Sequence, residues 1–319
     1  MNINKSGDKM IYTLTLNPAL DRTFYVDKIR EYESIKVKCE RRYAGGKGID
    51  VSRVIRQLGG ESIAMGFLGG FVGKEMEGRL LNEGVACNFV WIREETRTNV
   101  IIHSQDESEK EIRFNCSGPD VSPAELSDLF HHCRNLKPKP KFAVISGSVP
   151  GGVDPAVYEE LVLIFESQGA RVILDTYGEP LRKGLLGTPF MIKPNRRELS
   201  MLVGSELNTI DEIVPAARSL LEYVEVVAVS LGELGLLGVS ENKTVLARPP
   251  KVDIVNTVGA GDSAVAGMVL ALEAEMPFDE IIRRGAAAGT ASTLTEGTAT
   301  VNIEDFEKVL AQTKIEKID

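Results

Sequence analysis

Short apolar runs rich in β-branched residues alternate along this chain with longer segments in which apolar residues recur every three or four positions. The short runs predict strands at residues 11–16, 142–146, 172–175 and 226–230. The longer segments predict helices at residues 51–58, 156–168 and 210–221. Because strands that alternate with helices build βαβ units, we expect an α/β fold whose mostly parallel central sheet is flanked by helices.

Residues 22–116 follow a different pattern, with several strand-like segments and few helices between them. These segments are residues 24–26, 35–39, 88–91, 99–103 and 112–115. We expect a small β-sheet that protrudes as a lid, formed by segments within about residues 22–42 and 88–116. The polar residues 1–10 predict a disordered leader, so residues 11–319 would form a single domain.

Composition narrows the classes of protein that this chain can belong to. It has 319 residues, 43% of them hydrophobic, which is enough for a large buried core. With 37 basic and 46 acidic side chains its net charge is −9, so we expect no nucleic-acid partner. No apolar run approaches the ~20 residues of a membrane span, and we expect no membrane partner. The widely spaced cysteines predict reduced thiols in a cytoplasmic protein: Cys39, Cys87, Cys116 and Cys133.

The most informative motif is the turn Gly259, Ala260 and Gly261, which is followed by Asp262. It lies between a strand predicted at residues 252–255 and an apolar helix that begins near Ala264. Small residues at a helix N-terminus leave amide groups open to an anion, and the helix dipole adds to that attraction. Asp262 could then take the proton from a hydroxyl that attacks a phosphoryl group. The alternative is a tight turn in which Asp262 only complements the helix dipole.

A dinucleotide-binding loop is a second functional interpretation of the same turn. Gly259, Gly261 and Ala264 satisfy the relaxed fingerprint of that loop. However, Asp262 would place a carboxylate close to the pyrophosphate, and this repulsion favours the kinase interpretation. The other common phosphate loop, GxxxxGK[ST], does not occur in the sequence, so another element must hold the nucleotide.

Two segments near the N-terminus could bind a polyol. Gly45 and Gly46 precede a helix, with Asp50 in its first turn, and Asp21 follows the first strand. Glycines allow the backbone to approach a sugar closely, and carboxylates accept hydrogen bonds from its hydroxyls. Plain turns explain the same residues. The cations available for a phosphate on the substrate are on the lid segments, although each alone could be a surface charge: Lys36, Lys38 and Arg97.

Two further motifs follow predicted strands of the main sheet, where ligands of such folds collect. Asn195 and Glu198 begin a helix and could reach a magnesium ion or its waters, or could form a capping box, or both. Ser230 ends another strand, and its glycine-rich continuation could bind nucleotide phosphates or form a plain hairpin.

Taken in order, these motifs resemble those of the ribokinase-like carbohydrate kinases of the PfkB family, in the branch of phosphofructokinases and tagatose-phosphate kinases. The resemblance covers nearly the whole chain. It runs through residues 13–21 (TLTLNPALD), 44–50 (AGGKGID), 95–99 (ETRTN), 145–150 (ISGSVP), 192–199 (IKPNRREL), 229–232 (VSLG) and 257–263 (TVGAGDS).

The resemblance implies a lid sheet that closes over the sugar and forms a homodimer contact, and it implies roles for the motifs. Asp262 is the implied base, and Gly259, Ala260 and Gly261 form the implied anion hole. The implied sugar and phosphate ligands are Asp21, Gly45, Gly46, Asp50, Lys36, Lys38 and Arg97. Lys193, Ser230, Gly232 and Gly235 fall in the ATP-binding part, and Asn195 and Glu198 meet Mg²⁺. A loop for a monovalent cation, K⁺, would lie around Asn256, Val258, Ser292 and Gly297.

The implied activity is ATP-dependent phosphorylation of fructose 1-phosphate or fructose 6-phosphate to fructose 1,6-bisphosphate, with a slight preference for the first. Tagatose 6-phosphate is the nearest alternative acceptor, and a dinucleotide-dependent oxidoreductase or a non-catalytic nucleotide or sugar sensor represents another class. The chain departs from the family pattern twice. Asp50 replaces an asparagine of many relatives, and Tyr177 replaces a small residue near the nucleotide.

Overall fold

We describe a computed structural model of the chain, which covers residues 9–29, 32–104 and 111–318. The expected leader therefore falls mostly outside the described residues, and Met10 already belongs to the first strand.

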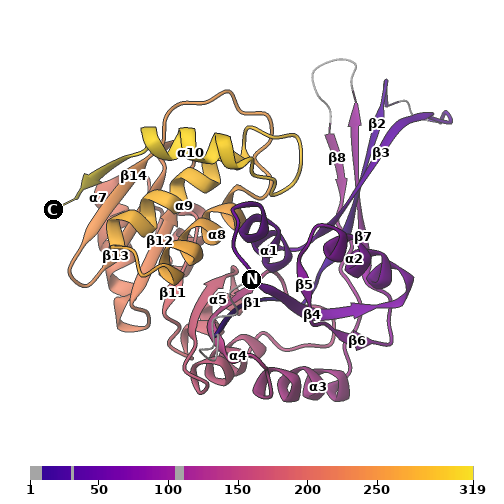
Figure 1. The fold of residues 1–319 in the computed structure, drawn as a ribbon, viewed down its shortest axis with the longest axis horizontal. Helices are drawn as coiled ribbons and strands as arrows, with labels where there is room; N and C mark the ends of the chain where they lie inside the picture. Colours follow the sequence, from indigo (N-terminus) through magenta and orange to yellow (C-terminus); the bar gives the residue numbers. More distant parts are fainter. Residues whose placement is uncertain (1–8, 30–31, 105–110, 319) are drawn as a thin grey trace, which may run out of the picture.

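Strands and helices alternate along most of the chain, as the sequence predicts (Figure 1). The main sheet contains β1 (Met10–Thr15), β4 (Ile63–Gly69), β5 (Ala86–Cys87), β6 (Val90–Ile92), β9 (Pro140–Ser146), β10 (Arg171–Asp175), β11 (Met191–Ile192), β12 (Val226–Ser230), β13 (Leu236–Ser240), β14 (Thr244–Arg248) and β15 (Lys314–Lys317). The helices are α1 (Lys47–Gln57), α2 (Gly70–Asn82), α3 (Pro123–Arg134), α4 (Val157–Glu166), α5 (Glu179–Leu185), α6 (Arg196–Val203), α7 (Ile210–Ser219), α8 (Ala260–Glu273), α9 (Phe278–Ser292) and α10 (Ile303–Gln312), with 3₁₀ turns at Leu220–Glu222 and Gly232–Leu234.

The order of strands in the main sheet brings the ends of its parallel strands together. Neighbouring strands follow the order β15-β14-β13-β12-β11-β10-β9-β1-β4-β5, and β6 also pairs with β4. The strands from β12 to β4 are mutually parallel, whereas β13, β14 and β15 are antiparallel. The C-terminal ends of β1, β9, β10, β11 and β12 therefore lie along one edge, where an α/β sheet binds its ligands.

Helices cover both faces of the main sheet and bury a core on each. On β10, Val172 and Leu174 pack into the core under α3, α4, α5, α6 and α7. Ile173 points the other way, into the core that α1, α8, α9 and α10 cover. This alternation of side chains gives a strand that is apolar on both faces, which is why its sequence is a continuous apolar run.

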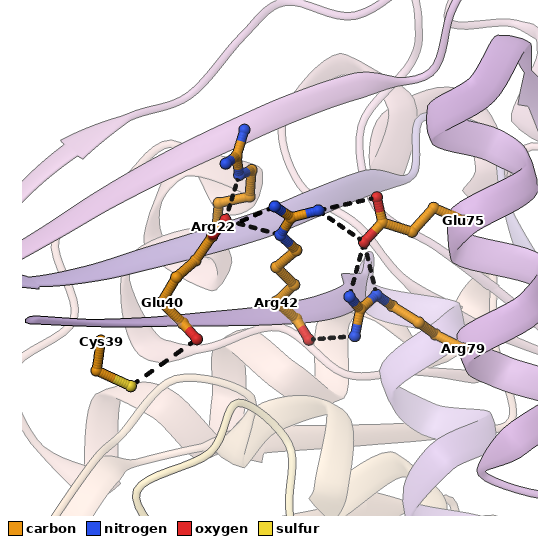
Figure 2. Close-up of polar contacts among 6 residues, drawn as sticks. All are labelled: Arg22, Cys39, Glu40, Arg42, Glu75 and Arg79. Carbon is orange, nitrogen blue, oxygen red and sulfur yellow. Dashed lines mark hydrogen bonds and ion pairs between the residues drawn. The ribbon is translucent and has the colours of Figure 1, made fainter. Parts of the chain in front are cut away.

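The small sheet stands apart from the main one (Figure 1). Its strands are β2 (Ala19–Val26), β3 (Val37–Gly45), β7 (Arg97–Ser104) and β8 (Glu111–Phe114), in the order β3-β2-β7-β8. A network of arginines and glutamates fixes β3 to α2 (Figure 2). Within it, Glu75 lies 3.3 Å from Arg42 and 2.7 Å from Arg79, and Arg42 lies 2.7 Å from Glu40.

Two segments differ from the prediction. Residues 88–91, expected in the small sheet, contribute to β6, which pairs in parallel with β4 of the main sheet. Residues 252–255, expected as a strand, are irregular, because the Val255 amide bonds to the carbonyl of Thr293 and not to a strand. Ile254 and Val255 are 51% and 57% exposed, so the apolar run does not mark a buried strand here.

Candidate active site

The N-terminus of α8 carries the turn that the sequence singles out. Gly259 caps the helix with φ at 84°, and a Cβ at this position would lie 2.5 Å from the nitrogen of Ala299. A side chain does not fit there. The Ala260 amide bonds to the carbonyl of Thr257 at 3.3 Å, so the amide of Gly261 is the next one at the open end of the helix. Asp262 follows in the first turn and is only 7% exposed.

Asp262 lies beside a second carboxylate, Asp175, at the C-terminal end of β10. Asp175 is completely buried, and its Oδ1 atom receives two cations. The Nζ atom of Lys47 lies 3.0 Å away, and that of Lys193 lies 3.4 Å away. Lys47 comes from the first turn of α1 and Lys193 from the segment after β11, so four parts of the chain meet here.

The two carboxyl groups have opposite pKa shifts. Burial alone would raise the pKa of Asp175, but Lys193 and Lys47 outweigh it and hold the pKa below its usual value. Burial raises the pKa of Asp262 well above its usual value, and the charges of Asp175 and Asp50 add to this against Lys47 and Lys193. The pair therefore holds one strong acid and one base whose affinity for a proton is increased.

Near this pair, at the base of the small sheet, lie the residues expected to bind sugar hydroxyls, here called the hydroxyl pocket: Asp21, Gly45, Gly46 and Asp50. Asp21 on β2 accepts a hydrogen bond from Asn99 on β7 at 2.8 Å. Gly45 packs directly on Asp21, because a Cβ at Gly45 would lie 2.3 Å from its Oδ2 atom. Gly46 has φ at 127°, a conformation that favours glycine. Burial raises the pKa of Asp21, and the Asn99 hydrogen bond opposes this.

Asp50 points from the first turn of α1 and is 5% exposed. Its Oδ1 atom lies 3.3 Å from the guanidinium of Arg53, which is also buried. Burial raises the pKa of Asp50 to about 7, against the charge of Arg53 and with that of Asp21. The charge of Asp50 also acts on Asp262, which links the hydroxyl pocket to the base.

The three cations proposed for a substrate phosphate lie in different places. Arg97 stays close to Asp21 and donates to the carbonyl oxygens of Asn17 at 2.8 Å and Cys116 at 2.6 Å. Lys36 and Lys38 are exposed at the far end of the small sheet, where Lys38 pairs with Asp27. At about 3.3 Å per residue, this end lies roughly 16 Å along the strand from Asp21. Lys36 and Lys38 therefore lie away from Asp21, although Lys38 lines a cavity that also reaches Val258.

The motifs expected to meet magnesium and nucleotide lie together at the same edge of the sheet. Asn195 and Glu198 form a capping box, with reciprocal bonds of 2.9 and 2.8 Å. Ser230 lies beside Asn195, and its amide bonds to the carbonyl of Pro194 at 3.0 Å. Gly232 and Gly235 shape the 3₁₀ turn between β12 and β13 with φ at 60° and 105°. Within residues 9–29, 32–104 and 111–318, His, Cys, Asp and Glu form no group of three that could hold a metal ion directly.

The loop expected to hold a monovalent cation is tied together by its own polar groups. Asn256 donates to the carbonyl of Gly297 at 3.4 Å and accepts from the amide of Val258 at 3.0 Å. The carbonyl of Ser292 accepts from Thr295 at 3.0 Å. Asn256, Val258 and Gly297 are thus neighbours, although 41 positions separate Asn256 from Gly297, and the Asn256 amide bonds at 3.2 Å to the carbonyl of Thr293, the residue after Ser292.

Sequence reasoning gave no role to Lys47 and Asp175, the two residues that complete the site. Lys47 lies within the glycine motif whose other members were given roles, and Asp175 is a carboxylate at the end of a buried strand. That position was the available signal, because the C-terminal ends of parallel strands meet at the ligand-binding edge.

The fold and the site together define the class of this protein. A buried carboxylate with a raised pKa at a helix N-terminus, close to the residues expected to bind sugar hydroxyls, suits a phosphotransferase with an alcohol group as acceptor. The model of the pfkB family of carbohydrate kinases matches residues 14–305, and the chain belongs to this family. The α/β fold with a separate small sheet and the enzyme class predicted from the sequence are confirmed.

Individual relatives are similar over nearly their whole length. The chain is 36% identical over 312 residues to 1-phosphofructokinase of Borreliella burgdorferi, covering 97% of this chain and 99% of that protein. It is 31% identical over 310 residues to tagatose-6-phosphate kinase of Staphylococcus epidermidis, covering 96% and 99%. The crystal structure of phosphofructokinase-2 from Escherichia coli in complex with potassium is similar with a TM-score of 0.90 and 35% identity, covering 95% and 99%.

Among the helices of residues 9–29, 32–104 and 111–318, none is both long enough and apolar enough to cross a membrane.

Proposed function

We propose that this enzyme transfers the γ-phosphoryl group of ATP to the free hydroxymethyl group of a fructose phosphate and so produces fructose 1,6-bisphosphate. Fructose 1-phosphate is the preferred acceptor in this proposal, fructose 6-phosphate the second, and tagatose 6-phosphate the nearest alternative. The observation that carries the proposal is Asp262, a buried carboxylate with a raised pKa between an amide turn and a pocket for hydroxyl groups. The names of the relatives support the substrate class.

In the proposed reaction, Asp262 takes the proton of the acceptor hydroxyl while the oxygen of that hydroxyl forms a bond to the γ-phosphorus. The bond from that phosphorus to the bridging oxygen breaks, and its electron pair leaves with ADP. A pKa raised toward the working pH makes Asp262 a stronger base than an ordinary aspartate. Gly259, Ala260 and Gly261 supply the helix N-terminus that stabilises charge on the transferred phosphoryl group. Asp21, Gly45 and Gly46 orient the sugar.

The magnesium ion of Mg·ATP fits the donors at this edge of the sheet. Oδ2 of Asp175 is buried and has no hydrogen-bond partner among the described residues, so it is open to a metal-bound water. Asp175, Asn195 and Glu198 would hold the ion through its waters, and the ion would neutralise charge on the phosphates. In the same proposal, Lys193, Ser230, Gly232 and Gly235 belong to the nucleotide site, and the loop around Asn256 holds a monovalent cation.

The small sheet is proposed as the contact of a homodimer. On the face opposite Asp21, Phe24, Ile102 and Ile112 are cross-strand neighbours, and Phe114 lies beside them with 55% of its surface exposed. An apolar row of this kind on a sheet face favours burial against a partner. In a dimer through this face, Lys36 and Lys38 would serve the partner's substrate. The free thiols of the four cysteines support a cytoplasmic location.

A coupled ADP-release assay tests the proposal with fructose 1-phosphate, fructose 6-phosphate, tagatose 6-phosphate, fructose and ribose. We expect turnover of a fructose phosphate, and a loss in kcat of about 10³-fold in Asp262→Asn with KM nearly unchanged. Asp211→Asn is the matched control, because Asp211 also lies in the first turn of a helix but is exposed.

Each outcome of the assay separates the candidate functions. Wild-type turnover in Asp262→Asn would contradict the base assignment and leave Asp262 with a structural role. Activity on unphosphorylated sugars alone would contradict the roles of Lys36, Lys38 and Arg97. No turnover of any sugar together with tight nucleotide binding would indicate a sensor, and binding of NAD without ATP would indicate an oxidoreductase.

A further inference from the structure

The hydroxyl pocket contains two carboxyl groups, Asp21 and Asp50, and Asp50 is the more deeply buried of the two. Asp50 is 5% exposed, and its ion pair with Arg53 is long, at 3.3 Å. The guanidinium of Arg53 also contacts other acceptors. Its Nε atom lies 2.6 Å from Glu83, and its Nη1 atom donates to the carbonyl of Thr298 at 3.1 Å.

The other groups that face Asp50 do not make up for this. Arg53 on its own helix is the cation that lowers its pKa, and an amide hydrogen bond from Gly46 assists. Asp21 faces it from β2, and Asp262 interacts with it from α8, and both are acidic. Neighbouring carboxylates oppose each other's ionisation, and Asp50 is more deeply buried than Asp21, so Asp50 is the group that keeps a proton. Burial, Arg53 and Asp21 together place the pKa of Asp50 at about 7.

We propose that Asp50 binds the acceptor sugar as a neutral carboxylic acid, whose O–H group donates a hydrogen bond to a hydroxyl oxygen of the sugar. This inference rests on the proposed function. An ionised carboxylate only accepts hydrogen bonds, so ionised Asp21 and Asp50 together would leave the lone pairs of the sugar oxygens without a donor from either side chain. A neutral Asp50 presents one donor and one acceptor, as the side chain of asparagine does.

The consequence is an acceptor affinity that falls as the pH rises. With a pKa of about 7, KM for the sugar phosphate should increase about 25-fold between pH 6.5 and 8.5. The phosphate of the substrate contributes little over most of this range, because its second pKa is about 6. The asparagine variant cannot ionise, so its KM should stay constant.

The experiment measures KM of the best acceptor and kcat from pH 6.5 to 8.5 for the wild type, Asp50→Asn and the control Asp211→Asn. We expect the rise in KM for the wild type and the control, and a change of less than about twofold for Asp50→Asn. A flat wild-type profile, or the same rise in Asp50→Asn, would overturn the inference. If Asp50→Asn does not fold, a flat wild-type profile of KM against pH still overturns the inference.

A second measurement does not need catalysis. The pKa of Asp50 is about 7 in the folded protein and about 4 when unfolded, so the folded state retains a proton that the unfolded state loses. This contribution to stability is complete below pH 4 and is lost as the pH rises to about 7. We expect a fall in Tm across this window that is smaller in Asp50→Asn. Equal profiles would show that Asp50 is not protonated, even if no acceptor is phosphorylated and the proposed function fails.

Discussion

Two pairs of carboxyl groups lie in this region, and the cations around them differ. At the phosphoryl end, Asp175 and Asp262 share Lys47 and Lys193, whose Nζ atoms both lie within 3.4 Å of Oδ1 of Asp175. At the acceptor end, the nearest cations of Asp21 and Asp50 are two arginines that bind other groups. Arg53 contacts Glu83 and a backbone carbonyl, and Arg97 contacts backbone carbonyls.

The pKa shifts follow this difference. The lysines lower the pKa of Asp175 while burial and the neighbouring charge raise that of Asp262, so one pair yields an anion and a base. At the acceptor end both pKa values are raised. Concentrated cations thus separate two carboxyl groups into different roles, whereas cations engaged elsewhere leave a pair that is better suited to hydrogen bonding with neutral hydroxyls.

The largest expected effect comes from Asp175→Asn, which removes the anion of the phosphoryl pair. We expect kcat to fall by about 10²-fold to 10³-fold, as for other groups that orient charge in an active site. The charge of Asp175 raises the pKa of Asp262, so its loss should also move the acid limb of the kcat profile to lower pH. An unchanged limb would show that Asp175 does not set the basicity of Asp262, and Asp211→Asn serves as the control.

A smaller loss of kcat is expected for Lys47→Met, together with a shift of the acid limb in the opposite direction. Lys47 lowers the pKa of Asp262, so its removal should move the acid limb to higher pH, with a loss in kcat of about tenfold at neutral pH. Kinetics from pH 5 to 9 measure the shift, and Lys308→Met on the exposed face of α10 is the control. If the acid limb moved in the same direction in Asp175→Asn and Lys47→Met, the two charges would not have opposite effects on the pKa of Asp262, which would contradict the prediction.

Sequence patterns predicted the glycine turn at the start of α8 because its residues are adjacent in the chain. Gly259 to Asp262 form one local unit at a helix start, and its chemistry can be inferred from the residue types alone. The Lys47–Asp175 contact has no such local signature, because 128 positions separate the two residues and only the parallel order of β1, β9 and β10 brings them together.

The fold shows the same contrast between its two sheets. Strands such as β10 and β12 were predicted almost to the residue, because burial on both faces makes them continuous apolar runs. Strands β2 and β3 extend to Ala19 and Gly45, well beyond the predicted segments. Among their added residues, Thr23, Arg41 and Tyr43 are polar and half-buried, because they line a cavity of about 510 Å³ and do not pack into a core.

The smallest expected effect concerns an ion pair across that cavity, which provides an exposed reference for the two buried pairs. Arg41 on β3 lies 2.7 Å from Glu296, with 40% and 67% of the two side chains exposed. Because water screens such a contact, a double-mutant cycle of Arg41→Ala and Glu296→Ala should give a coupling of about 0.2–1 kcal/mol in the free energy of unfolding. Urea denaturation measures it, and high salt should reduce it further. A coupling above about 2 kcal/mol would mean that exposure does not weaken charge interactions in this cavity. Burial would then not explain why the carboxyl pairs of the site have shifted pKa values.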